Sequence, residues 1–136
     1  MAEIDQDRLN SITRLRKGIG PEPLPDEPFY GCVMQAVSYV THADWVRYGT
    51  SPDSTSPICA QLAINLNDSA PARTRRRLIA LIPRLANSRS TTPEIERARA
   101  ELLRREGSPW WARFDLADPA GWNAVFDLLV EALDVA

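Results

Sequence analysis

Apolar side chains recur at steps of three and four residues through much of this chain, and this spacing constrains the fold more than any other feature. In an α-helix such residues share one face, whereas a half-buried strand alternates them at every second residue. The spacing is clear in three segments: Cys32, Val33, Ala36, Val37 and Val40; Leu78, Leu81, Ile82 and Leu85; and Trp122, Val125, Phe126, Leu129 and Leu133. We therefore predict an all-α fold, a compact bundle of about five helices.

A proline-rich segment, PEPLPDEP, precedes the first strong helical pattern. Its four prolines within residues 21–28 exclude a helix and a central strand, because proline lacks the backbone N–H that both structures use. We expect an extended strap of polyproline II type there. A chain of 136 residues has the length of one domain. We divide it into an N-terminal arm and Pro-rich strap, residues 1–28, and a single helical domain, residues 29–136.

Prolines and small polar residues predict the limits of the first helices after the strap. We expect Trp45 and Tyr48 to cover the end of the helix that follows Phe29. Residues 57–67 are predicted to form a short buried helix, and their β-branched residues leave a strand as the alternative. Asp68 or Ser69 with Pro71 indicates the next helix start, and Pro83 should kink or end that helix. Asn67 and Asp68 together are expected to cap that helix.

Similar signals set the limits of the last helices. Thr91 or Thr92 before Pro93 indicates a helix start, with Glu94 at capping-box spacing from Thr91. Gly107 is expected to end this helix, and an aromatic segment, residues 108–114, follows it. Asp118 then caps the final helix at Pro119. Its first apolar residue, Trp122, is predicted to belong to the core.

The charges of this chain are strongly segregated although its net charge is only −2. Ten of the 16 basic residues lie between Arg73 and Arg105, where three glutamates oppose them, so this window carries +7. Residues 1–72 carry −4 and residues 106–136 carry −5. Segregation of this kind bears on partners and on electrostatic steering, and it says little about the fold.

The arginines of the basic window are the strongest candidates for a binding function. On a helical wheel, four of them fall on the side away from the apolar residues: Arg73, Arg76, Arg77 and Arg84. Such a stripe suits an acidic protein surface, which we predict as the partner. Nucleic-acid binding through these residues and Arg75 is the alternative. A solvated face, or contact with the acidic termini of the chain itself, also stays open.

The next helix is expected to be largely self-neutralised. Glu101 stands four residues from both Arg97 and Arg105, the spacing at which opposite charges pair along a helix.

Residues capable of catalysis or metal binding occur, but not in the patterns that those functions need. Ser38, His42 and Asp44 could form a nucleophile, base and orienting acid, but no G-x-S-x-G turn frames the serine. Cys32, His42 and Cys59 lack zinc-site spacing and a fourth ligand. Nucleotide-binding and zinc-protease motifs are absent from the sequence. We predict no catalytic residue, metal ligand or cofactor, and keep a small hydrolase or metal enzyme as a second alternative.

The sequence from Gly31 to Leu85 contains GCVMQAVSYV, then Trp45, SPICAQLAINLND and LIPRL. This pattern resembles a family of small, uncharacterised proteins of actinobacteria and their phages. The resemblance implies kinship and a host range, without an activity. The chain departs from the family pattern at Gln35, where glutamate is usual, and lacks an acidic, His-containing loop after the Trp. If those groups carried chemistry in relatives, this chain has lost it.

The hydropathy of the chain bears on its cellular location. No stretch of 18 apolar residues occurs, so we expect no membrane partner. The segment MAEIDQDRLN is acidic and lacks the apolar region of a secretory signal. We therefore expect a cytoplasmic protein in which Cys32 and Cys59 are free thiols. The oligomeric state stays open.

Overall fold

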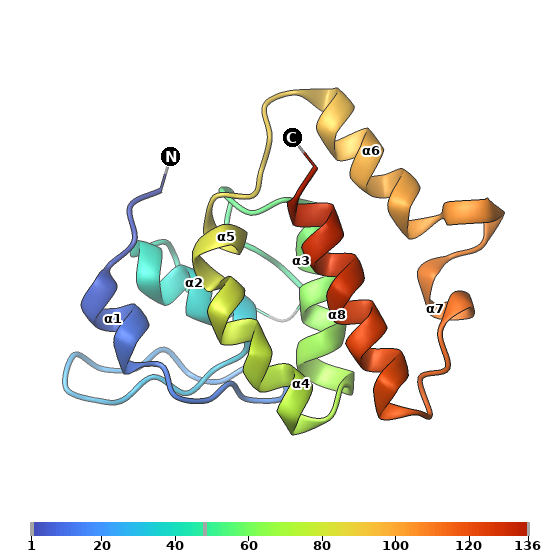
Figure 1. Cartoon of the computed structure of the whole chain (residues 1–136). Coiled ribbons are helices and arrows are strands. Elements are labelled where there is room, and N and C mark those ends of the chain that lie inside the picture. Colours follow the sequence, from blue (N-terminus) through green and yellow to red (C-terminus); the bar gives the residue numbers. More distant parts are fainter. Residues whose placement is uncertain (1, 48, 136) are drawn as a thin grey trace.

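All regular secondary structure in residues 2–47 and 49–135, the part that the computed structural model describes, is helical (Figure 1). The all-α prediction is confirmed. The described residues form eight α-helices, more than the five or so expected, with two 3₁₀ segments. The elements are α1 (Gln6–Ser11), α2 (Val33–Thr41), α3 (Pro57–Ser69), α4 (Ala72–Arg77), η1 (Leu78–Leu81), α5 (Ile82–Ala86), α6 (Pro93–Leu103), η2 (Arg105–Gly107), α7 (Trp110–Arg113) and α8 (Pro119–Leu133).

Helix α3 lies at the centre of the molecule, packed against α2 on one side and α8 on the other (Figure 1). Helix α5 covers α2, and α6 contacts both α3 and α8. The core contains the three apolar faces expected from the sequence, and only Cys32 of these residues is merely half-buried. Burial of these faces is what makes short helices stable, since isolated helices of this length are marginal in water.

Helix α8 forms as predicted. The Asp118 carboxylate accepts a hydrogen bond from the backbone N–H of Ala120, and Pro119 occupies the first turn. Trp122 is 7% exposed and its indole N–H donates to the carbonyl oxygen of Leu116, so its assignment to the core is confirmed. No helix in residues 2–47 and 49–135 combines the length and apolar character needed to cross a membrane.

Helices α4 and α5 are joined by η1 into one bent rod. Pro83 lies in the first turn of α5, so the expected interruption takes the form of a 3₁₀ segment just before the proline. The predicted cap of α4 is wrong, because Asp68 and Ser69 still belong to α3 and Pro71 takes the cap position without a side-chain hydrogen bond.

The segment between α6 and α8 departs most from expectation. Helix α6 ends at Leu103, and Gly107, in the left-handed conformation with φ of 74°, ends η2 instead. Thr92 takes the cap position of α6, without a side-chain hydrogen bond to the helix, so the capping box expected between Thr91 and Glu94 does not form. The aromatic segment 108–114 contains the short helix α7, which the sequence pattern did not predict.

The N-terminal arm packs on the helical core. Ile12 and Leu15 are buried, and the backbone N–H of Asp5 donates to the carbonyl oxygen of Val40. The proline-rich segment contains no helix or strand, as predicted, but it is not uniformly extended, because a turn closes from Leu24 to Glu27. Trp45 lies against Phe29, with ring centroids 6.1 Å apart, whereas Tyr48 lies outside the described residues.

Candidate binding site

The four arginines predicted as one stripe have different environments. Arg73 and Arg76 are exposed, with no side-chain hydrogen bond or ion pair to the described residues. Arg77 stacks over the Phe126 ring, with its guanidinium carbon 4.0 Å from the ring centroid. Arg84 forms an ion pair with Asp134, 2.5 Å between Nη2 and Oδ1. Only Arg73 and Arg76 therefore keep the open, unpaired character expected of the stripe.

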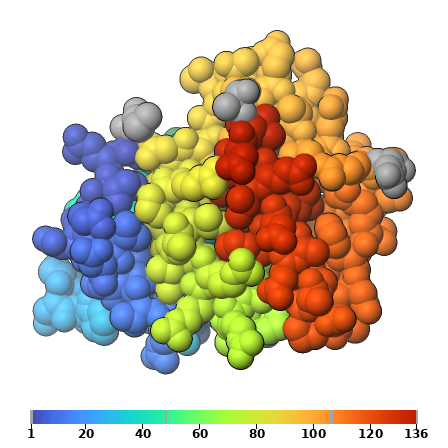
Figure 2. Space-filling view, in the orientation of Figure 1, coloured from blue at the N-terminus to red at the C-terminus, as the bar shows by residue number. Residues whose placement is uncertain are grey.

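The 3₁₀ segment η1 lies between Arg77 and Arg84 and changes the angle between them along the rod. A 3₁₀ helix has fewer residues per turn than an α-helix, so the four residues of η1 add roughly 80° of rotation compared with a continuous α-helix. Arg77 and Arg84, on either side of η1, nevertheless both contact α8, at Phe126 and at Asp134 respectively. In the space-filling view the rod lies between the N-terminal arm and α8 (Figure 2).

The N-terminal arm supplies further basic residues beside α4. Arg14 stacks on the Tyr30 ring, 4.4 Å from its centroid, and Arg16 approaches the same ring at 5.6 Å. A shallow depression of about 450 Å³, which we call the basic concavity, is lined by Thr13, Arg14, Leu15, Tyr30, Ala72, Arg75 and Arg76. It joins two segments about 60 residues apart in the sequence, which a helical wheel cannot bring together.

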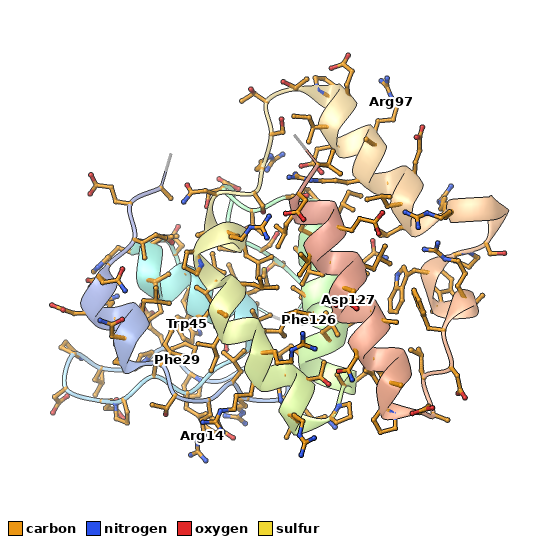
Figure 3. All side chains as sticks on the ribbon, viewed as in Figure 1. Arg14, Phe29, Trp45, Arg97, Phe126 and Asp127 are labelled. Atoms are coloured by element: carbon orange, nitrogen blue, oxygen red, sulfur yellow. The ribbon has the colours of Figure 1, made fainter. Side chains whose placement is uncertain are left out.

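The basic concavity has no internal counter-charge among the described residues. The guanidinium groups of Arg14, Arg75 and Arg76 form no ion pair there, and no aspartate or glutamate lines the depression. Tyr30 is 42% exposed. Arg14 marks this end of the molecule, and Arg97 on α6 lies at the opposite end (Figure 3). The concavity thus presents three guanidinium groups and one aromatic ring to a ligand.

The arginines of α6 and η2 are not neutralised by Glu101 as expected. Arg105 pairs with Glu131 of α8, 2.6 Å between Nη2 and Oε1. Within the described part of the chain, Arg97 and Arg104 have no ion pair. The i,i+4 rule failed here because tertiary contact with α8 offered Arg105 a closer carboxylate.

Arg99 is buried, which the sequence gave no reason to expect. Its side chain is 5% exposed and donates to Glu96 Oε1 at 3.0 Å, to the Ala132 carbonyl oxygen at 2.8 Å and to the Ser88 carbonyl oxygen. The Ser56 hydroxyl donates to the other Glu96 oxygen at 2.8 Å. These residues, Ser56, Ser88, Glu96 and Arg99, form what we call the ionic network. It connects α3, α6, the segment after α5 and the end of α8.

A second buried network consists of two amide side chains, Gln35 and Asn67. Gln35 Oε1 accepts from the N–H groups of Gly20 and Cys32, and its Nε2 donates to the carbonyl oxygens of Gly20 and Val46. A methyl group on Gly31 would lie 2.6 Å from this Oε1, so the close contact requires glycine. Gln35 therefore joins the start of α2 to Gly20, just before the strap, and to the loop after α2 at Val46.

Asn67 completes this amide network. Its Oδ1 accepts from the backbone N–H of Val33 at the start of α2, and its Nδ2 donates to the Arg16 carbonyl oxygen. Asp68 accepts from the backbone N–H of Gly18. The two residues therefore hold α2 and the N-terminal arm, whereas the sequence had suggested that they cap the following helix.

The structure does not assemble the Ser38, His42 and Asp44 set. Ser38 is buried, and its hydroxyl donates to the Met34 carbonyl oxygen. His42 ends α2 in the left-handed conformation, and its Nε2 lies 2.7 Å from Asp5 Oδ2 instead of contacting Asp44. The hydrogen bonds from His42 and from the backbone N–H of Arg8 hold the pKa of the Asp5 carboxyl below its usual value.

The two cysteines are free thiols in packed environments. Burial raises the pKa of the Cys32 thiol and of the Cys59 thiol, which disfavours the reactive thiolate. Within the described residues no three His, Cys, Asp or Glu side chains gather closely enough to hold a metal ion. The basic concavity is therefore the most distinctive candidate site.

Comparison with known proteins adds no relative. No protein-family model, curated protein sequence or solved structure matches the chain.

Proposed function

We propose that this protein is a non-catalytic binding protein and that the basic concavity engages an acidic surface of a protein partner. The observation that carries the proposal is the meeting of Arg14, Arg75 and Arg76 around the exposed ring of Tyr30, without a carboxylate among the described residues that line the depression. This proposal revises the set of four partner-binding arginines. Arg76 remains in the proposed site, and Arg73 precedes the concavity residues of α4 in the sequence. Arg77 and Arg84 are left out, because they contact α8.

The chemistry of the concavity suits carboxylates. Arginine presents a planar fork of donors that binds a carboxylate through two parallel hydrogen bonds, and it loses less hydration than lysine on doing so. Tyrosine and arginine are also the residues that most often dominate the energy of protein interfaces. Packing of the N-terminal arm holds Arg14 beside α4 before any partner arrives, which lowers the entropy cost of binding.

Binding of single-stranded nucleic acid is the second candidate, and Tyr30 is the observation that favours it. Bases stack on aromatic rings while arginines contact the phosphates, independently of sequence. Two facts weigh against it. The Arg14 guanidinium already covers one face of the ring at 4.4 Å, and the whole chain carries a net charge of −2. We therefore favour the acidic protein partner.

Fluorescence anisotropy with labelled polyanions tests the proposal. The probes are an acidic poly-glutamate peptide, a single-stranded DNA and a duplex DNA, matched in charge and measured at physiological ionic strength. We expect the peptide to bind more tightly than either DNA. Arg75→Glu with Arg76→Glu should abolish this binding. The matched control, Arg47→Glu with Arg89→Glu, makes the same change of charge at two exposed arginines that do not line the concavity and should leave it unchanged.

The outcomes separate the two candidates. Tight DNA binding whose affinity falls steeply with salt, with a log–log slope of roughly −3 for three phosphate contacts, would favour the nucleic-acid alternative. If none of the three polyanions responds to the Arg75 and Arg76 reversals, the concavity is a solvated face and the proposal fails. Circular dichroism of each variant confirms that the fold is retained.

A further inference from the structure

A second depression, which shares no residue with the basic concavity, lies between α3, α6 and α7. It encloses about 440 Å³ and exposes mainly apolar surface. Its apolar walls come from Ile58, Ala100, Leu103, Pro109, Trp110 and Trp111. We call it the tryptophan groove. In Figure 1, α6 and α7 stand out from the body of the bundle on this side, beyond α8.

The two tryptophans have contrasting positions in this groove. Trp110 is only 4% exposed, whereas the adjacent Trp111 is 57% exposed, the second most exposed of the large apolar side chains described. Their rings meet edge to face with centroids 6.0 Å apart, so the exposed ring packs against the buried one. A held, exposed tryptophan beside a concave apolar wall is typical of a protein-binding hot spot.

Charged residues along α6 mark the rim of the groove. Arg97 and Arg104 both line it, and neither has an ion pair among the described residues. They are seven residues apart, which corresponds to about 10 Å along a helix axis. Glu101 lies between them in the sequence and also lines the groove. The rim therefore alternates positive, negative and positive charge along roughly two helical turns.

We infer that the tryptophan groove binds an amphipathic helix of a partner protein. This helix carries large apolar residues along one stripe and a carboxylate near each end of that stripe. The apolar stripe covers Leu103 and Trp111, and the two carboxylates pair with Arg97 and Arg104. Glu101 repels an acidic residue at the centre of the partner helix and so fixes the alignment of that helix along α6. This surface is independent of the acidic partner surface proposed for the basic concavity.

The dimensions of the groove favour such a helix over a small ligand. Two guanidinium groups about 10 Å apart require an elongated anion with two charges. A helix presents side chains seven residues apart on the same face, at the same spacing as Arg97 and Arg104. The exposed Trp111 also leaves one side of the groove open, whereas small-molecule sites enclose most of their ligand.

Binding of designed peptides tests the inference. The probe is an amphipathic peptide of about four helical turns, with a leucine and phenylalanine stripe and glutamates seven residues apart at its ends. A second peptide carries lysine in place of both glutamates. Binding is followed through the indole N–H signals of Trp110 and Trp111 in two-dimensional nitrogen–proton NMR spectra of the full chain. We expect the acidic peptide to shift both signals and the lysine peptide to leave them unchanged.

Two variants provide independent tests. The affinity for the acidic peptide should fall roughly tenfold or more in Trp111→Ala, as expected for an interface hot spot. The double reversal Arg97→Glu with Arg104→Glu should lower it by a similar factor. Leu24→Ala, at the exposed Leu24 of the proline-rich segment, is the matched control and should leave affinity unchanged. Because Trp111 is mostly exposed, the melting temperature of its variant should stay close to that of the parent.

Three results would overturn the inference. They are unchanged indole signals with the acidic peptide, equal binding of the acidic and lysine peptides, and tight binding of a simple medium-chain fatty acid without binding of the peptide. A failure of the proposal for the basic concavity is distinguishable from these three results. The double variant Arg75→Glu with Arg76→Glu should not alter binding of the amphipathic peptide.

Discussion

Both buried polar networks attach a peripheral segment to the helical core, one through neutral amide side chains and the other through an ion pair. The amide network of Gln35 and Asn67 fastens the N-terminal arm and strap to α2 and α3 through neutral hydrogen bonds. The ionic network fastens α6 to α3 and α8 through the Arg99–Glu96 pair. Burial of charge costs more than burial of a neutral amide, and the cost is recovered only while every partner is present. We therefore expect the ionic network to be the more sensitive of the two.

Removal of Arg99 should have the largest effect. Arg99→Met leaves Glu96 without its cation and two carbonyl oxygens without their donor, and breaking a buried pair in this way costs about 3–5 kcal/mol. Urea unfolding of the variant measures the loss. Adding Glu96→Gln removes the unpaired charge and should recover part of the stability. A loss under about 1 kcal/mol, the range of exposed ion pairs, would contradict the assignment of this pair as buried.

A change at Gln35 should have an intermediate effect. Gln35→Glu keeps the acceptor but removes the donor to the carbonyl oxygens of Gly20 and Val46, and it buries a carboxylate against them. We expect a loss of about 1–3 kcal/mol near neutral pH. Acidification protonates the new carboxyl and restores a donor, so the loss should shrink as pH falls. A loss independent of pH would instead indicate a packing defect.

The smallest effect is expected at the exposed contact between Asp5 and His42. The pKa of Asp5 is lowered in the folded protein, so the contact stabilises the fold above the usual pKa of aspartate and is lost as pH falls through the lowered value. The melting temperature of Asp5→Asn should therefore lie slightly below that of the parent near neutral pH and converge with it in strong acid. A persistent difference in strong acid would indicate a role of the residue beyond its charge.

The helical pattern predicted the elements whose stability depends on burial of one apolar face. Residues of α2, α3, the rod from α4 to α5, and α8 follow it closely, and Asp118 and Pro83 act at the positions expected of them. The short helix α7 escaped, because four residues are too few to show a period. The networks also escaped prediction, since the partners of Gln35, Asn67 and Arg99 are mostly backbone groups distant in sequence.

The candidate site was predicted only in part for a related reason. The sequence identified the basic window, and Arg73 and Arg76 are exposed as expected. A helical wheel could not anticipate that α8 packs beside the rod and provides contacts for Arg77 and Arg84. It also could not bring Arg14 and Tyr30 to α4. The exposure of Trp111 had no sequence signal, because adjacent tryptophans in an aromatic segment look equally apolar.

The contact between Ala2 and Asn87 has a consequence for the order in which this protein acquires its structure during synthesis. The backbone N–H of Ala2 donates to Asn87 Oδ1 at 2.8 Å, and Asn87 Nδ2 donates back to the Ala2 carbonyl oxygen, across 85 residues. A ribosome adding about 5–20 residues per second needs roughly 4–17 s to produce that second partner. Until Asn87 is made, Ala2 lacks this partner, whereas Val40, which accepts from the backbone N–H of Asp5, is available about 47 residues earlier.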